Sequence, residues 1–287
     1  MELLGNRLQQ YALLLRLDKP IGIALLLWPT LWALWLASRG QPHLKIFFVF
    51  VVGVILMRSA GCVVNDFADR HIDGHVQRTR HRPLVSGTVN SVEAWILAGF
   101  LGLVAFSLVL LCNPLTIKLA FIGAGLTLIY PFMKRFTHLP QLGLGIAFAW
   151  GIPMAFAAET AAIGFSAWIL FIAGALWPVI YDTMYAMVDK EDDIKIGVKS
   201  TAILFGHRDT KIIACLQIAF IILLVTMGGV FQLTKIYYLS LVFVAALFLY
   251  QQMLIKNRNP TQCFRAFLNN HWVGMIIFVG IALNYLL

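Results

Sequence analysis

The sequence predicts an all-α polytopic membrane protein with nine transmembrane helices around a central cavity. Hydrophobic residues make up 60% of the 287 positions and charged residues only 12%, and the mean hydropathy is +0.83. Soluble domains carry about 25% charged residues. Apolar runs of about twenty residues, the length that a membrane-crossing helix needs, recur along the whole chain. We therefore expect one integral-membrane domain over residues 1–287, because no polar stretch is long enough to fold separately.

Nine apolar stretches are the expected spans. They cover residues 21–38, 46–64, 91–111, 115–132, 141–158, 165–188, 211–231, 236–255 and 270–287. Turn-forming residues separate most of them, as at Asn113-Pro114 and between Asn257 and Pro260. Prolines inside spans predict kinks at Pro29, Pro153 and Pro178.

The distribution of basic residues indicates the orientation of the spans. If the N-terminus is cytoplasmic, 17 of the 22 Lys and Arg residues, Arg78 among them, fall on the cytoplasmic side, and Arg58 lies inside a span. The opposite side receives only Arg39, Lys45, Lys118 and Lys235. Cytoplasmic loops of membrane proteins collect Lys and Arg in this way. The pattern therefore favours nine spans and a cytoplasmic N-terminus, and it explains the net charge of +9 without a nucleic-acid partner.

A first acidic cluster, NDFADRHID (residues 65–73), follows the second span directly. Its aspartates, Asp66, Asp69 and Asp73, are three and four positions apart and share one face if the stretch is helical. Like charges this close repel one another unless a cation lies between them. Asn65 adds an amide oxygen, either as a further metal ligand or as a hydrogen-bonding group at a helix end.

A second acidic cluster, YDTMYAMVDKEDD (residues 181–193), lies at the end of the sixth span. Steps of three, four and four positions separate Asp182, Tyr185, Asp189 and Asp193, which again places them on one helical face. An even number of membrane crossings separates the two clusters, so both lie at the same surface. Solvated loop charges are the alternative interpretation, but a charge at the end of a membrane span is costly. We therefore expect the clusters to face each other across one cavity.

All-oxygen ligands of this kind suit Mg²⁺, which binds one or two carboxylates, keeps several waters and takes substrate phosphates as further ligands. Ca²⁺ is compatible by ligand type but is less natural beside phosphate. Two clusters would fit two Mg²⁺ ions that clamp one lipid diphosphate and promote its ionisation. The allylic cation that ionisation leaves needs protection from water and electron-rich neighbours. Tyr130 and Tyr185 are candidates for that role, and interfacial anchoring is their alternative.

Basic residues near the clusters are candidates to bind the phosphates and an anionic co-substrate. Arg58 lies within a span, about two turns before the first cluster, and pairing with a nearby carboxylate is its alternative. Lys134 and Arg135 end the fourth span, where positive-inside residues also occur. Lys195 and Lys199 follow the second cluster and either contact phosphate or are solvated.

Two longer segments resemble known signatures. MRSAGCVVNDFADRHIDGHVQRTRHRPL (residues 57–84) resembles the first signature of the UbiA-type intramembrane prenyltransferases. The NDxxDxxxD pattern of that signature is matched by Asn65, Asp66, Asp69 and Asp73. YDTMYAMVDKEDDIKIGVKST (residues 181–201) resembles the second signature, whose DxxxD is matched by Asp189 and Asp193. Residues 16–34 and 130–141 resemble the 4-hydroxybenzoate polyprenyltransferase branch, so the resemblance covers essentially the whole chain.

This resemblance implies a fold and an activity. The fold is a nine-helix bundle around a cavity with a lateral opening to lipid, in a bacterial inner membrane. The implied reaction transfers a polyprenyl group from its diphosphate to 4-hydroxybenzoate, meta to the carboxylate, as a step of ubiquinone biosynthesis. Two Mg²⁺ ions would act with the catalytic aspartates Asp69, Asp73, Asp189 and Asp193. By the same resemblance Arg70 is a neighbour of the diphosphate, and which basic residue meets the benzoate carboxylate stays open.

Two other functions compete with this interpretation. A related enzyme would use the same chemistry on a naphthoate, haem or homogentisate acceptor, against which only the branch-specific segments argue. A transporter with an acidic cation site belongs to a different class, since intramembrane carboxylates and kinked helices occur there too. Transporters place such sites near the midplane, often between inverted halves. Both clusters here lie at one surface with the same orientation, which favours the enzyme.

Overall fold

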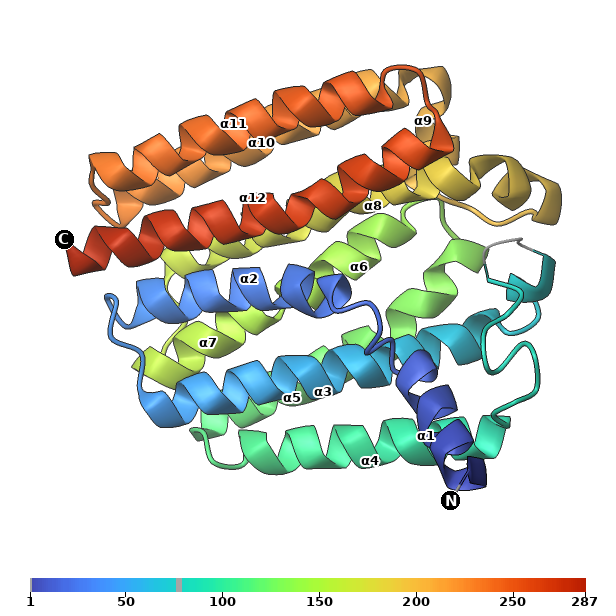
Figure 1. Ribbon diagram of the computed structural model, residues 1–287. Coiled ribbons are helices and arrows are strands. Elements are labelled where there is room, and N and C mark those ends of the chain that lie inside the picture. The colour runs from blue at the N-terminus through green and yellow to red at the C-terminus, as the bar shows by residue number, and fades with distance from the viewer. Residues whose placement is uncertain (1, 76–78) are drawn as a thin grey trace.

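The computed structural model describes residues 2–75 and 79–287, and Arg78 therefore lies outside the described residues (Figure 1). Within these two ranges the regular elements are helices, and no strand occurs. Eight described helical segments are long and apolar enough to cross a membrane, and α2 (Ile21–Ala37) is a shorter apolar helix. The predicted all-α membrane fold is thus confirmed, and the described helices are consistent with nine spans.

The element bounds follow the predicted spans closely. The helices are α1 (Glu2–Leu14), α2 (Ile21–Ala37), α3 (Leu44–Asp69), α4 (Ser91–Val109), α5 (Pro114–Ile129), α6 (Pro140–Ala149), α7 (Gly151–Thr160), α8 (Phe165–Ile196), α9 (Thr201–Phe205), α10 (Asp209–Val230), α11 (Lys235–Ile255) and α12 (Pro260–Leu286). Three short 3₁₀ turns are η1 (Asp73–His75), η2 (Tyr130–Arg135) and η3 (Gly206–Arg208).

The turn signals in the sequence work as helix starts. The side chains of Asn90, Asn113 and Asn259 cap α4, α5 and α12 by accepting a backbone N–H of the first turn. Pro114 and Pro260 then occupy the first helical position, where a missing N–H costs nothing. These local preferences fix where α4, α5 and α12 begin.

The three predicted kinks have different outcomes. The fifth span is interrupted at Trp150, between α6 and α7, three residues before Pro153. Proline removes a backbone donor and its ring clashes with the carbonyl four residues earlier, which here is that of Ala149. Pro29 and Pro178 lie inside α2 and α8, whose helical assignment continues through them.

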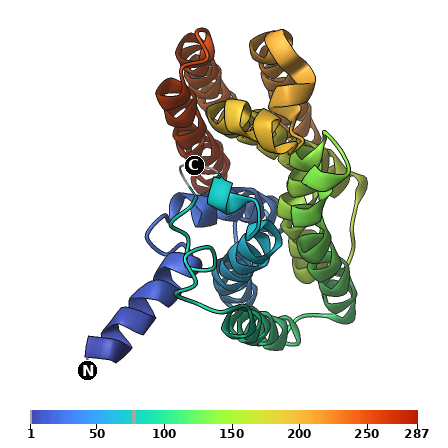
Figure 2. The same ribbon diagram turned by 90° about the vertical axis from the view of Figure 1, so that its right-hand side faces the viewer.

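The helices form a closed ring in which neighbours along the chain pack side by side (Figures 1 and 2). The last helix, α12, packs against α2 and closes the ring, with Trp32 donating its indole N–H to the Gly274 carbonyl at 3.0 Å. Gly145 of α6 lies directly against the Ala175 carbonyl of α8, an approach that a side chain would block. Small residues thus allow the close helix packing that positions the cavity walls.

Three helices extend well beyond the predicted spans. α3 continues past residue 64 to Asp69, α8 continues past residue 188 to Ile196, and α12 begins at Pro260 rather than at residue 270. These extensions are more polar than the spans, so a criterion based on apolar runs stops short of them. An additional helix, α1, precedes the first span and packs through Leu14 against α3 and α4.

Candidate functional site

A cavity of about 670 Å³ lies at the end of the bundle where α3 ends and α8 carries the second cluster. Its walls come from α2, α3, η2, α6, α8 and α12. The acidic and amide side chains that line it are Asn65, Asp69, Asp73, Gln141, Asp182, Asp189 and Asp193. The two acidic clusters, distant in the sequence, therefore face one cavity, as the spacing argument predicts.

Several other predicted site residues also line this cavity. They are the tyrosines and basic residues Tyr130, Tyr185, Arg58, Lys134 and Lys199. α8 carries the second cluster together with Tyr185. The helix ends at Ile196, and the next residue, Gly197, has a backbone φ of 73°, which favours glycine. The second cluster is therefore presented by one continuous helix, as predicted.

Four predicted residues are not brought to the cavity wall. Asp66 is buried and pairs with two arginines, Arg16 and Arg82, which themselves line the cavity. Arg70 stacks on Phe67 and donates to the Phe67 carbonyl at 2.8 Å, at the end of α3. Arg135 donates to the Ala68 carbonyl. Lys195 is 70% exposed and pairs with Asp192 at 3.3 Å. The metal-ligand role of Asp66 and the substrate-binding roles of these three basic residues stay predictions.

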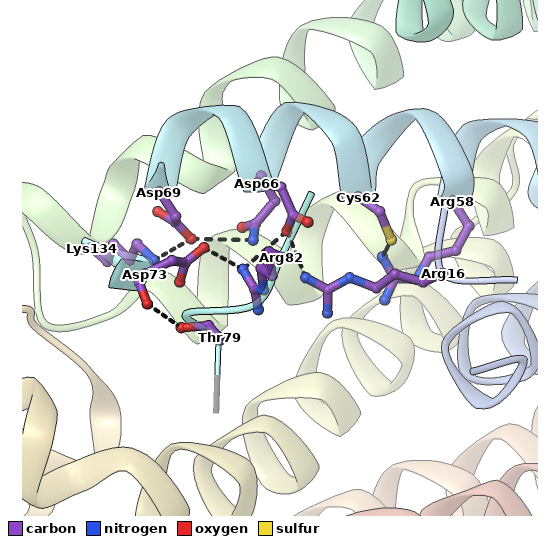
Figure 3. Close-up of polar contacts among 10 residues, drawn as sticks. Arg16, Arg58, Cys62, Asp66, Asp69, Asp73, Thr79, Arg82 and Lys134 are labelled. Carbon is purple, nitrogen blue, oxygen red and sulfur yellow. Dashed lines mark hydrogen bonds and ion pairs between the residues drawn. The ribbon is translucent and has the colours of Figure 1, made fainter. Parts of the chain in front are cut away.

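The first cluster is only partly helical. α3 ends at Asp69, and Asp73 lies beyond it in η1, so the three aspartates do not share one helical face. Asp69 Oδ2 accepts a hydrogen bond from Asn65 Nδ2 at 3.2 Å and lies 2.5 Å from Lys134 Nζ (Figure 3). The other oxygen, Asp69 Oδ1, is buried and has no hydrogen-bonding partner among the described residues. Asp69 therefore keeps a buried oxygen to which residues 2–75 and 79–287 donate no hydrogen bond.

Two arginines hold the remaining carboxylates of this cluster. Arg82 Nη1 donates to Asp73 Oδ2 at 2.5 Å and to Asp66 Oδ1 at 3.0 Å, and Arg16 Nη2 donates to Asp66 Oδ1 at 2.6 Å (Figure 3). Burial raises the pKa of Asp73, and the neighbouring carboxylates of Asp69 and Asp66 raise it further, while Arg82 opposes the change. The cluster is thus a crowded network of charges rather than a row of solvated acids.

The turn η2 contacts both of the segments that resemble family signatures. Lys134 reaches Asp69 with its side chain, and its carbonyl accepts the backbone N–H of Lys199 at 3.1 Å. Lys199 Nζ in turn donates to the Phe136 carbonyl at 3.2 Å, just after η2. The residues that follow the fourth span therefore lie between the end of α3 and the segment after α8.

Sequence reasoning missed several residues of the cavity wall. Arg16 and Arg82 are lining residues whose polar loops gave no periodic signal, although Arg82 falls inside the first signature-like segment. Phe264 and Phe267 of α12 lie near Tyr185, with ring centroids 6.1 and 4.8 Å away. The predicted ninth span began at residue 270, so these two rings were left out. Phe264 and Phe267 are three positions apart in the polar first part of α12, and this helical spacing could have identified them as neighbours on one face.

A second cavity of about 530 Å³ adjoins the first. It is bounded by α2 to α7 and is lined mainly by apolar side chains and glycines. Arg58, Tyr130 and Phe148 line both cavities. Arg58 Nη1 donates to Cys62 Sγ at 2.6 Å, while its buried Nε has no hydrogen-bonding partner within the described ranges. The described partner of Arg58 is thus a thiol rather than the carboxylate considered as its alternative.

The donor set fits Mg²⁺. Carboxylate and amide oxygens from α3, η1 and α8 line the cavity, and Asp69 offers one buried oxygen that no described residue contacts by a hydrogen bond. Among the described residues no three His, Cys, Asp or Glu side chains are gathered closely enough to form a complete protein cage. Mg²⁺ does not need such a cage, because it usually binds through one or two carboxylates and completes its shell with water and phosphate.

The fold and the cavity define a polytopic membrane protein that can receive an anionic group beside an apolar chamber. The model of the UbiA prenyltransferase family matches residues 26–275 of this sequence. The chain therefore belongs to the UbiA prenyltransferase family.

Relatives and solved structures agree with this membership. The chain is 55% identical over 282 residues to the 4-hydroxybenzoate octaprenyltransferase of Coxiella burnetii (strain CbuK_Q154), covering 98% of both sequences. The apo structure of a UbiA homologue from Aeropyrum pernix K1 matches with a TM-score of 0.80 and 26% identity, over 91% of this chain and 97% of that one. A UbiA homologue from Archaeoglobus fulgidus bound to GPP and Mg²⁺ matches with a TM-score of 0.74 over 97% and 100%; at 16% identity this likeness shows the fold alone.

Proposed function

We propose that this protein transfers a polyprenyl group from polyprenyl diphosphate to 4-hydroxybenzoate, at the ring carbon meta to the carboxylate, as a step of ubiquinone biosynthesis. The observation that carries the proposal is the polar cavity lined by both acidic clusters, which adjoins an apolar chamber. The name of the Coxiella burnetii relative supports the acceptor and the class of donor. We further propose that the whole chain acts as one domain of a bacterial inner membrane, with its N-terminus and the cavity mouth cytoplasmic.

The acidic clusters are the proposed metal site. Asn65, Asp69 and Asp73 on one side, and Asp182, Asp189 and Asp193 on the other, would hold two Mg²⁺ ions. Bound Mg²⁺ would neutralise the negative charge that develops on the leaving diphosphate. The allylic C–O bond breaks, the ring carbon ortho to the phenol forms the new C–C bond, and that carbon loses its proton. The products are the prenylated benzoate, diphosphate and a proton.

The protein's own cations have two proposed tasks. Lys134, Lys199 and Arg82 line the polar cavity near the clusters and would bind phosphate oxygens. Arg58 lies deeper, where the two cavities meet, and has a buried N–H that finds no acceptor among the described residues. We assign Arg58 to the benzoate carboxylate, because a guanidinium binds a carboxylate with charge-assisted hydrogen bonds.

Aromatic side chains have a protective role in this proposal. Tyr130 lies beside Arg58 at the junction of the cavities, and Tyr185 packs against Phe267 and Phe264 on the opposite wall. Rings presented to an allylic cation stabilise it through their quadrupoles. The same rings exclude water, which would otherwise capture the cation.

A membrane assay tests the proposal. Membranes that contain the expressed protein are mixed with labelled 4-hydroxybenzoate and a polyprenyl diphosphate, with either Mg²⁺ or EDTA. We expect Mg²⁺-dependent transfer of label into the organic phase. If folded protein transfers the polyprenyl group only to labelled naphthoate or homogentisate, the acceptor is wrong. If no acceptor is prenylated with several chain lengths of donor, the reaction is wrong.

A further inference from the structure

Lys134 is the side chain that links the first acidic cluster to the rest of the cavity. Its ammonium lies 2.5 Å from Asp69 Oδ2, and the Asp69 side chain is only 3% exposed. Lys134 itself lines the cavity, and its carbonyl accepts a hydrogen bond from the backbone of Lys199, close behind the second cluster. The backbone of Lys134 is therefore held in place while its long side chain borders the open cavity.

Asp69 is also the cluster member best suited to receive a metal ion. It lines the cavity, it is the last residue of α3, and its buried Oδ1 has no hydrogen-bonding partner in the part of the chain that the structure describes. A divalent cation on this carboxylate would lie close to the Lys134 ammonium. Cations that share one buried carboxylate repel each other strongly, because few solvent molecules are present to screen them. Asp69 can therefore serve the ammonium or the metal well, but not both.

A diphosphate changes this balance. Its oxygens bind Mg²⁺ and also attract an ammonium group, so Lys134 gains a second anion to contact. The lysine ammonium is carried on a flexible stem of four carbons. The backbone of Lys134 is anchored beside the segments of both clusters. A short movement of the ammonium from Asp69 into the cavity therefore exchanges one anionic partner for another.

We propose that Lys134 and a divalent cation compete for Asp69, and that diphosphate relieves the competition by accepting the Lys134 ammonium. Metal and diphosphate then bind with positive coupling, each favouring the other. The inference deepens the proposed function, on which it rests for the identity of the two ligands. Lys134 thereby disfavours metal binding to the protein alone and favours it when the donor substrate is present.

Direct metal titration tests the competition without any chemistry. The full chain is purified in detergent, stripped with a chelator and titrated with Mn²⁺, whose signal in electron paramagnetic resonance falls on binding. Mn²⁺ shares the oxygen-ligand preference of Mg²⁺. The titration is repeated with inorganic diphosphate, corrected for the complex that Mn²⁺ and diphosphate form in buffer. We expect Lys134→Met to bind Mn²⁺ alone roughly tenfold more tightly than the unmodified protein, within the usual range of coupling between sites.

The second arm of the titration measures coupling. Diphosphate is expected to tighten Mn²⁺ binding to the unmodified protein and to do so much less in Lys134→Met. Lys134→Arg keeps a cation near Asp69 and should retain weak binding of Mn²⁺ alone. The matched control is Lys118→Met, which removes an exposed ammonium that lines neither described cavity and should change neither titration. If Lys134→Met does not fold, Lys134→Gln carries the same expectation.

The inference is overturned if folded Lys134→Met or Lys134→Gln binds Mn²⁺ alone no more tightly than the unmodified protein. This outcome is distinct from failure of the proposed function. A protein that shows the predicted coupling but prenylates no aromatic acid contradicts only the proposed reaction. A protein that prenylates 4-hydroxybenzoate while Lys134 has no effect on metal affinity contradicts only the competition.

Discussion

The two acidic clusters face the same cavity but are built in different ways. The second cluster lies within α8, so the spacing of Asp189 and Asp193 is set by one turn of a continuous helix. The first cluster straddles the end of α3, and basic residues from separate segments hold its carboxylates. One side of the site is thus fixed by helix geometry, and the other depends on tertiary contacts. The predictions below test this difference.

The largest expected effect concerns chemistry, where the clusters should be equivalent. Asp69→Asn and Asp189→Asn should each lower prenyl transfer on the order of a thousandfold, because each weakens the stabilisation of charge on the diphosphate. The measurement is transfer of labelled 4-hydroxybenzoate at saturating Mg²⁺, with membrane content checked by immunoblot. Near-normal activity in one variant alone would mean that only the other cluster carries the metal.

The next effect concerns folding, where the clusters should differ. Arg82→Met removes the guanidinium that pairs with Asp73, while Asp66 keeps Arg16, and an uncompensated buried charge costs about 3–5 kcal/mol of stability. Thermal unfolding in detergent should show a clear loss of stability for this variant. The double variant Arg82→Met/Asp73→Asn should recover most of the loss, because it removes the charge that lost its partner. No recovery would indicate that Arg82 acts through packing.

A smaller effect distinguishes the deep cation from the cations near the clusters. Arg58→Met should raise the KM for 4-hydroxybenzoate by roughly 10- to 100-fold, the value of one or two hydrogen bonds to a charged group. The KM for the polyprenyl diphosphate should change much less, since Arg58 lies away from the clusters. Lys118→Met is the control, because Lys118 does not line either cavity. The opposite pattern of KM changes would assign Arg58 to the diphosphate.

The smallest effect concerns the aromatic wall. Phe267→Leu keeps an apolar side chain of similar reach but removes the ring beside Tyr185. We expect kcat to fall about fivefold, in line with one cation–π contact in a largely desolvated site. Single-turnover measurements would separate this effect from product release. An unchanged rate, with more hydrolysis of the donor, would assign the ring to water exclusion alone.

The sequence alone predicted the membrane-spanning helices and the arrangement of side chains along a single helix. Apolar runs located the spans, and the predicted span 21–38 corresponds to α2. Counting crossings placed both clusters at one cavity, and helical spacing described the second cluster correctly. These inferences work because burial in lipid and the helical repeat act locally along the chain.

The remaining features depend on contacts between distant segments. Asp73 was expected on the same helical face as Asp69, but α3 ends between them. Arg16 lies fifty positions from its partner Asp66, and no local pattern predicts such a pairing. Phe264 was missed because the start of α12 is polar, although tertiary packing keeps it helical. Irregular loops and polar helix ends therefore mark the limit of prediction from one sequence.

The contact between α12 and α2 has a consequence for how the protein is made. A growing chain inserts its helices in order, so α12 reaches the membrane long after α2. Until then α2 lacks the neighbour that Trp32 contacts through Gly274, and the wall that carries Phe264 and Phe267 is missing. A ribosome that stalls before residue 260 would therefore leave inserted helices whose buried charges are open to one side.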